Sequence, residues 1–86
     1  MSKCQKRLQK AKNSANNFRF VELCKLAECY GWILRNQEGS HLIYKNDQLE
    51  ITQGCRQTFQ NDNGKAVPYQ VKQLLNAIEF LEENDE

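Results

Sequence analysis

Two stretches with the apolar spacing of an amphipathic helix enclose a middle region of short strand-forming segments, and this order limits the possible folds most strongly. In the first stretch, residues 19–30, apolar side chains recur at positions i, i+3, i+4 and i+7. Gly31 follows directly and suits the left-handed residue that ends a helix. We therefore predict a helix over residues 19–30. Its apolar stripe comprises Phe20, Leu23, Cys24 and Ala27.

The second helical stretch begins at Pro68, because proline is tolerated in the first turn of a helix. Apolar residues then recur at helical spacing almost to the end of the chain, which predicts a last helix. Its apolar stripe comprises Val71, Leu74, Leu75, Ile78 and Leu81.

The region between the two helices predicts an antiparallel meander of three strands, over residues 32–36, 41–45 and 49–52. Turn residues separate these segments, first around Gly39 and then at Asn46-Asp47. Residues 53–66 are rich in Gly, Asn and Asp, which predicts a long loop.

The fold class predicted from this order is α+β: a helix, a three-stranded antiparallel sheet and a helix, with both helices on one sheet face. The other face of the sheet is then open to ligands. Double-stranded-RNA-binding domains share this order of elements, although order alone does not give function. The folded domain is expected over residues 17–86, after a basic segment, residues 1–16, that forms a short helix or is mobile.

Length and composition exclude several classes of protein. A chain of 86 residues forms one domain with little room for a deep cavity, which suits a polymeric substrate. It has no apolar run long enough to cross a membrane and no secretory signal, so we expect a cytoplasmic protein. The four cysteines form no Cys-x-x-Cys pair, so we expect no metal site. An even number of cysteines in a short chain allows a disulfide framework, but without a secretion signal we favour reduced, buried thiols.

Charge is unevenly distributed along the chain. Residues 1–30 carry seven Lys or Arg and two Glu, whereas residues 70–86 carry one Lys and five acidic residues. The basic first third is either an electrostatic footprint for a phosphate backbone or an ordinary solvated helix.

The only histidine, His41, stands at the start of a predicted strand directly after the Gly39 turn. An imidazole can take a proton from a ribose 2′-OH or give one to a leaving 5′-oxygen, and such cleavage needs no metal or cofactor. Arg35 and Lys45 on neighbouring strands supply positive charge, and Ser40 supplies a hydrogen bond to phosphate. The alternative interpretation is a surface histidine that happens to follow a turn.

Three further residues have both a structural and a functional interpretation. Trp32 is expected in the core, although an aromatic ring can also stack on an unpaired base. The side of the sheet that Tyr44 occupies depends on strand register and stays open. Lys65, at the entrance to the last helix, either binds RNA phosphate or is a solvated lysine.

Three short segments follow one another in this region: Gly31-Trp32, then Arg35, then residues 39–44 (Gly-Ser-His-Leu-Ile-Tyr). Together they resemble the core signature of HicA-type toxins, also called YcfA-like proteins. Residues 17–26 resemble the lead-in of longer members, and residues 64–71 resemble the entrance to their last helix. Leu42 stands where shorter members often have a second histidine.

This resemblance implies a metal-independent endoribonuclease that cuts messenger RNA and inhibits translation, on a fold like that of a double-stranded-RNA-binding domain. His41 matches the histidine on which toxicity depends. The partner implied is a HicB-like antitoxin that covers the active face, so the chain is expected to be a monomer alone and a hetero-oligomer with antitoxin. Two alternatives remain: a non-catalytic RNA-binding module, and a degenerate toxin that acts as a protein-interaction partner.

Overall fold

The computed structural model describes residues 2–83 and has an α+β fold with a four-stranded antiparallel sheet and three α-helices in this range. Two short 3₁₀ turns, η1 and η2, complete the described elements. In chain order the elements are α1 (Lys3–Asn13), η1 (Ala15–Asn17), α2 (Phe20–Cys29), β1 (Ile33–Glu38), β2 (His41–Lys45), η2 (Ile51–Gln53), β3 (Arg56–Asp62), β4 (Lys65–Ala66) and α3 (Pro68–Glu83).

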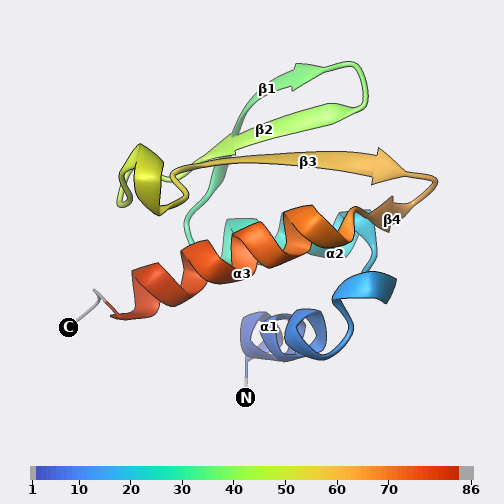
Figure 1. Ribbon diagram of the computed structural model, residues 1–86, viewed down its shortest axis with the longest axis horizontal. Helices are drawn as coiled ribbons and strands as arrows, with labels where there is room; N and C mark the ends of the chain where they lie inside the picture. Colours follow the sequence, from blue (N-terminus) through green and yellow to red (C-terminus); the bar gives the residue numbers. More distant parts are fainter. Residues whose placement is uncertain (1, 84–86) are drawn as a thin grey trace.

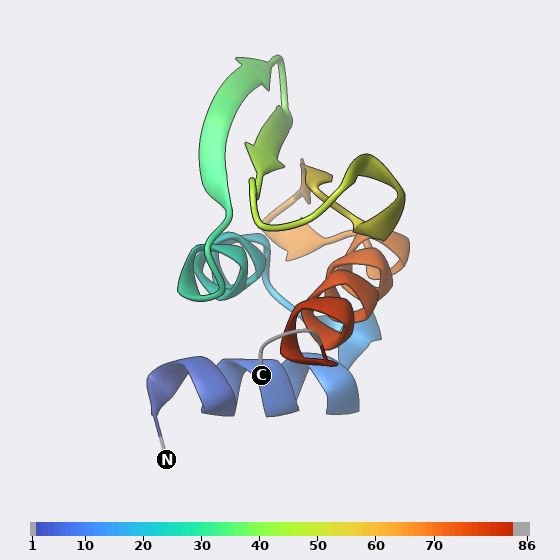
Figure 2. The same ribbon diagram turned by 90° about the vertical axis from the view of Figure 1, so that its left-hand side faces the viewer.

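The elements form three layers (Figures 1 and 2). The sheet is the first layer, α2 and α3 cover one of its faces, and α1 lies across the far side of these two helices, which it contacts. The other face of the sheet carries no helix, as the sequence predicts for two helices on one face. The layering therefore leaves one sheet face and the outer side of α1 at opposite ends of the molecule.

The sheet has the order β1-β2-β3-β4, with antiparallel pairing throughout. The central strand β2 pairs with β1 on one side and with β3 on the other. The register with β1 shifts between Leu34 and Asn36, which makes Arg35 the extra residue of a β-bulge. β1 is an edge strand, and all six of its residues are exposed.

The core lies between the sheet and the helices. Trp32 is 1% exposed, which confirms the sequence prediction, and its indole N–H donates to the carbonyl oxygens of Gly54 and Cys55. Tyr44 is 2% exposed, so its register places it on the helix-facing side, where its ring contacts that of Phe59. Because both aromatic rings are buried, neither Trp32 nor Tyr44 is available to stack on a base.

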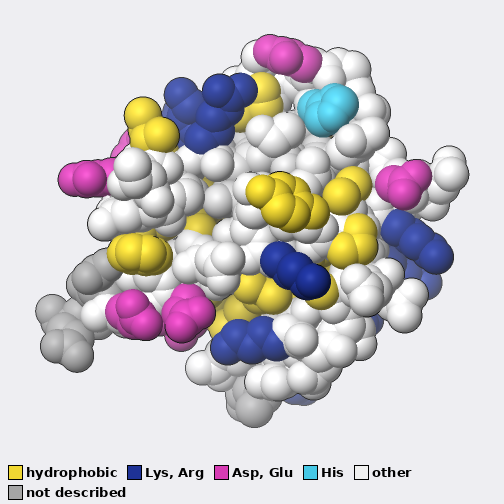
Figure 3. Space-filling view, in the orientation of Figure 1, with side chains coloured by type: hydrophobic (Ala, Val, Ile, Leu, Met, Phe, Trp, Pro, Cys, Tyr) yellow, Lys and Arg dark blue, Asp and Glu magenta, His cyan; other side chains and the backbone are white. Residues whose placement is uncertain are grey.

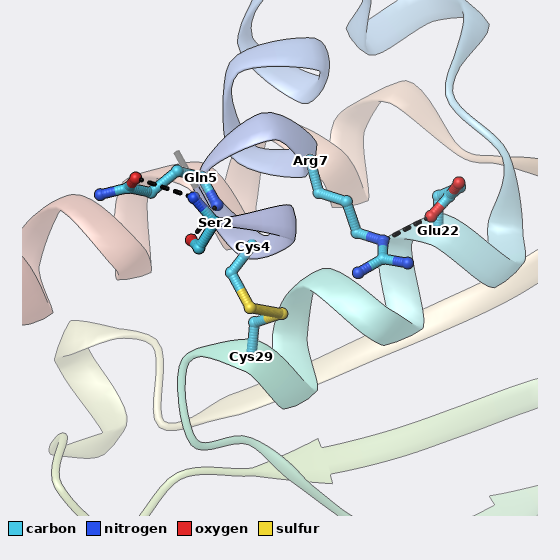
Figure 4. The surroundings of a disulfide bond; sticks show 6 residues. All are labelled: Ser2, Cys4, Gln5, Arg7, Glu22 and Cys29. Carbon is cyan, nitrogen blue, oxygen red and sulfur yellow. Dashed lines mark hydrogen bonds and ion pairs between the residues drawn. A yellow bond between two sulfur atoms is a disulfide. The ribbon is translucent and has the colours of Figure 1, made fainter.

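The basic N-terminal segment forms a helix that is packed onto the rest of the fold. Ser2 caps α1 in a capping box with Gln5, and Leu8 and Ala11 are buried against the layer above. An ion pair between Arg7 Nε and Glu22 Oε2, 2.7 Å long, joins α1 to α2 (Figure 4). Of the two alternatives for this segment, the structure shows the helix.

The expectation that all four cysteines are reduced is wrong for two of them, since Cys4 of α1 and Cys29 of α2 form a disulfide (Figure 4). The capped helix brings the two Cα atoms to 5.8 Å, within disulfide range, and they are 25 positions apart in the sequence. Cys24 and Cys55 are free thiols, and Cys24 is buried as predicted.

The predicted third strand is also wrong. Leu49 is buried, but the chain turns through η2 at Ile51–Gln53. The third strand is instead β3, which lies with β4 inside the predicted loop 53–66. The sequence does not indicate β3 as a strand, because its residues are mostly polar. Of its two buried positions, one is occupied by Gln57 and the other by Phe59.

In the part of the chain that the structure describes, no helix combines the length and the apolar character needed to span a membrane.

Candidate functional site

The position of His41 is fixed by a two-residue hairpin turn between β1 and β2. Gly39 has φ +60° and Ser40 does not have positive φ, which is the pattern of a type II′ turn. Glu38 and His41 flank the turn as a directly paired position of the two strands. The turn predicted at Gly39 is confirmed, and it holds the imidazole at one end of the central strand.

Alternation along β2 places His41, Ile43 and Lys45 on the sheet face that carries no helix, because Leu42 and Tyr44 pack toward the helices. We call this surface the open face. Ile43 is 6% exposed but lies outside the main core, so the side chains around it on the open face bury it. The β3 residues opposite these three are Gln60, Thr58 and Arg56.

The open face is polar and partly cationic. Lys45 and Arg56 are directly opposite each other and both are exposed. Like charges at such a position repel each other, and a bound anion removes the repulsion. Figure 3 shows the single imidazole in cyan and a group of Lys and Arg side chains in dark blue at the same, sheet-bearing end of the molecule.

Glu38 lies directly across the strand pair from His41. Its carboxylate accepts a hydrogen bond from Asn36 Nδ2 at 3.3 Å, from the same face of β1. The His41 imidazole is half-buried, and no residue among 2–83 hydrogen-bonds to its ring. Both ring nitrogens are therefore available to a substrate, with one carboxylate on the neighbouring strand.

Arg35 is the bulged residue of β1 and does not share the regular alternation of the sheet. Its guanidinium makes an ion pair with Asp47 at 3.5 Å, with the two side chains 48% and 83% exposed. An exposed pair of this kind is weak and readily exchanged for a phosphate. Arg35 is therefore available at the Lys45 end of the open face.

Ser40 lies at the border of the open face, and Lys65 lies beyond it. Ser40 lines a hollow of about 460 Å³ between the two hairpin ends, together with the helix-facing residues Gln37 and Leu42. Lys65 is in β4, so β3 separates it from the strand of His41. The structure thus places His41 and Lys45 at the two ends of β2 on one surface, with Arg35 in the bulge of the neighbouring strand, Ser40 at the border of that surface and Lys65 beyond it.

Arg56 is the residue that sequence reasoning missed. It lies in the segment taken for a loop, so nothing placed it opposite Lys45. A usable signal was Asn63-Gly64, whose φ values of +52° and +88° are those of a type I′ hairpin turn. An Asn-Gly hairpin predicts a strand before residue 63, and that strand contains Arg56.

The basic helix α1 lies at the opposite end of the molecule from the open face in both ribbon views (Figures 1 and 2). Its lysines are exposed. A single stretch of RNA backbone on the open face would therefore not reach them without wrapping around the protein. The charge asymmetry in the sequence and the single histidine mark two separate surfaces.

A buried polar group supports the sheet from the helix-facing side. The Tyr44 hydroxyl donates to Glu28 Oε2 at 3.1 Å, and desolvation, with Cys24 and Glu28 nearby, raises the pKa of Tyr44 well above its ordinary value. Burial likewise raises the pKa of the Cys24 thiol. Both groups stay protonated at neutral pH, so we assign them a structural role.

Comparison with protein-family models, with curated proteins and with solved structures gives no match to this chain.

Proposed function

We propose that this protein is a metal-independent endoribonuclease of the HicA type that cuts messenger RNA. The observation that carries the proposal is the position of its only imidazole on an open, partly cationic sheet face, which carries the Lys45–Arg56 pair at the other end of the same strand ladder. The signature around Gly39-Ser40-His41 supports it independently, because those residues form the turn that presents the histidine. On this proposal the fold is of the double-stranded-RNA-binding type, with an added helix α1 and strand β4.

In this mechanism His41 takes the proton of a ribose 2′-OH, whose oxygen then attacks the adjacent phosphorus and expels the 5′-oxygen of the next nucleotide. The products are one fragment with a 2′,3′-cyclic phosphate end and one fragment with a 5′-hydroxyl end. Glu38, directly across from His41, stabilises the imidazolium formed in the first step. A water or a lysine protonates the leaving 5′-oxygen, because in an in-line attack the entering and leaving oxygens lie on opposite sides of the phosphorus, and the imidazolium then returns its proton to solvent.

The cations of the open face are assigned to the RNA backbone on either side of the cut. Lys45 is four positions from His41 along β2, about 13 Å of strand, so it and Arg56 hold a neighbouring phosphate rather than the one that reacts. Arg35 joins them when it leaves Asp47. Ser40, at the border of the open face, donates to a phosphate on the other side of His41.

The partner we propose is a HicB-like antitoxin that covers the open face and so blocks His41. A cytoplasmic location follows from this proposal, since both the messenger RNA and the antitoxin are found there.

The second candidate is an RNA-binding module without catalysis. The observation that favours it is the separation between the cationic pair and the imidazole, which allows Lys45 and Arg56 to hold RNA without any contribution from His41. This candidate predicts binding that depends on the cations and no cleavage.

The test is cleavage of labelled single-stranded RNA by the purified chain, in the presence of a metal chelator, with wild type beside His41→Ala. Gln60→Ala is the matched control, because Gln60 is the polar neighbour opposite His41 on the same face. The proposal expects 2′,3′-cyclic phosphate ends from wild type and Gln60→Ala, and a loss of at least about a hundredfold in His41→Ala. Equal rates for His41→Ala and wild type would overturn it.

A further inference from the structure

A second hollow, of about 330 Å³, lies beyond the cationic end of the open face, between η2, β3 and α3. Arg56 lines this hollow and also pairs with Lys45 on the open face. A strand of RNA whose phosphate is held by Lys45 and Arg56 therefore has the hollow directly beside it. None of the residues that line the hollow is acidic.

The walls of the hollow combine apolar surface with carboxamides. Phe80 and Ile51 border it and are 44% and 86% exposed, which is high for large apolar side chains. Gln73 and Asn76 lie on the same side of α3 as Phe80, at spacings of seven and four residues. One side of the helix therefore presents an aromatic ring and two amides to the same space.

The side-chain amides of Gln73 and Asn76 make no hydrogen bond within the described residues, whereas neighbouring side-chain amides do. Gln57 Nε2 donates to the carbonyl of Gly54, Gln53 Oε1 accepts from the backbone of Glu50, and Gln70 Oε1 accepts from Gln60 N–H. By contrast, no residue in the range 2–83 hydrogen-bonds to the side chain of Gln73 or Asn76. Two carboxamides thus present donors and acceptors to a partly aromatic space.

We infer that this hollow binds one unpaired nucleobase of the RNA strand that crosses the open face. A carboxamide matches the donor and acceptor edges of a base, and an exposed aromatic ring stacks on its face. Arg56 holds the phosphate of the same nucleotide. The inference rests on RNA as the proposed ligand, but it does not require that the RNA be cut.

The experiment compares binding of two short, labelled RNA strands to the His41→Ala protein, which cannot cut them. One strand carries all its bases and the other has abasic positions throughout its centre. The test variant adds Gln73→Ala and Asn76→Ala. The control variant adds Gln9→Ala and Asn13→Ala, two exposed amides of α1 that bond only to each other. Thermal unfolding of each variant reports whether the fold is kept.

The expected result is that Gln73→Ala with Asn76→Ala weakens binding of the complete strand about tenfold and leaves binding of the abasic strand unchanged. The α1 control binds both strands as the parent does. The inference is overturned if the test variant binds the complete strand as tightly as the parent does, or if it loses the same affinity for both strands. It is also overturned if the parent does not bind RNA.

The outcome separates this inference from the proposed cleavage. If wild type does not cut RNA but the base-dependent loss is found, the hollow binds a base in a non-catalytic module. If wild type cuts RNA through His41 while the test variant binds the complete strand like the parent, the cleavage proposal stands and the nucleobase site is wrong.

Discussion

Single residues set the geometry of both ends of the candidate site. At one end, a positive φ at Gly39 closes the hairpin that presents His41. At the other end, Gly54 ends η2 in a left-handed conformation and accepts hydrogen bonds from the side chains of Trp32 and Gln57. Each glycine adopts a backbone conformation with positive φ that other residues rarely adopt, and at Gly54 there is also no space for a side chain.

Gly54 and Gly64 provide a matched pair for measuring that difference. Both have φ near +90°, but a Cβ on Gly54 lies 2.6 Å from Ala77 Cβ, whereas a Cβ on Gly64 meets nothing within 4 Å. Gly64→Ala is expected to lower the free energy of unfolding by about 1–2 kcal/mol through backbone strain alone. Gly54→Ala adds overpacking against α3, for a total of at least about 3 kcal/mol. Chemical denaturation of both variants measures the difference, and equal losses would contradict the role given to Ala77.

The free thiols give a second test at the residue scale. Burial raises the pKa of Cys24, so its thiolate is scarce at neutral pH as well as shielded, whereas Cys55 is only half-buried. In the folded, oxidised protein an alkylating reagent is expected to modify Cys55 first, and Cys24 only under denaturing conditions. Mass spectrometry of the modified protein identifies the site, and early labelling of Cys24 would contradict its buried environment.

At the scale of elements, the fold is held together partly by the docking of α1, and that docking is covalent as well as apolar. The Cys4–Cys29 disulfide joins residues 25 positions apart and so closes a loop that contains nearly all of α1 and the whole of η1 and α2. The Arg7–Glu22 pair forms a second link between the same helices. A short chain with a small core gains more from such links than a large one.

Removal of the disulfide tests the first link. Cys4→Ser with Cys29→Ser, or reduction of wild type, is expected to lower the free energy of unfolding by about 2–4 kcal/mol, mainly because the unfolded chain regains freedom. Urea denaturation with and without reductant measures this loss. No change on reduction would mean that the apolar contacts of Leu8 and Ala11 alone hold α1 in place.

The ion pair is tested through pH. The hydrogen bond from Arg7 lowers the pKa of Glu22, so the carboxylate stabilises the fold above its ordinary pKa, and this contribution disappears as the pH falls through the lowered value. Glu22→Gln is expected to be less stable than wild type at pH 7 by up to about 1 kcal/mol, because both partners are partly exposed. At strongly acidic pH the two proteins should have equal stability. A constant difference across the titration would show that packing, not charge, is responsible.

How far the elements could be predicted from sequence depends on where their stabilising contacts come from. α2, β2 and α3 carry their own apolar pattern and turn residues, and the structure confirms all three. β3 exists because β2 offers it a full ladder of partners, while its own sequence, with Gln57 turned inward, has too few apolar residues to indicate a strand. The same rule holds for the site, since the local motif is enough to single out His41, whereas Arg56 can be placed only once its strand is known.

At the scale of the whole molecule, the three layers separate two cationic surfaces. The lysines of α1 form one and the Lys45–Arg56 pair forms the other, with α2, α3 and the sheet between them (Figure 2). A polyanion that contacts His41 uses the second surface. If the proposed function is right, the net charge of the N-terminal third is a poor guide to the RNA-binding surface, although it is the most visible electrostatic feature of the sequence.

The salt dependence of RNA binding distinguishes the two surfaces. Removal of one cation that binds a phosphate reduces the slope of log affinity against log salt by about 0.7 for a single strand. Lys45→Ala with Arg56→Ala is therefore expected to reduce the slope by about 1.4, whereas Lys6→Ala with Lys10→Ala on α1 leaves it unchanged. The two variants remove the same number of charges, so a general effect of net charge would change both slopes equally. A reduced slope in the α1 variant alone would place the RNA backbone on the helical end, away from His41, and would remove the electrostatic basis for cleavage on the open face.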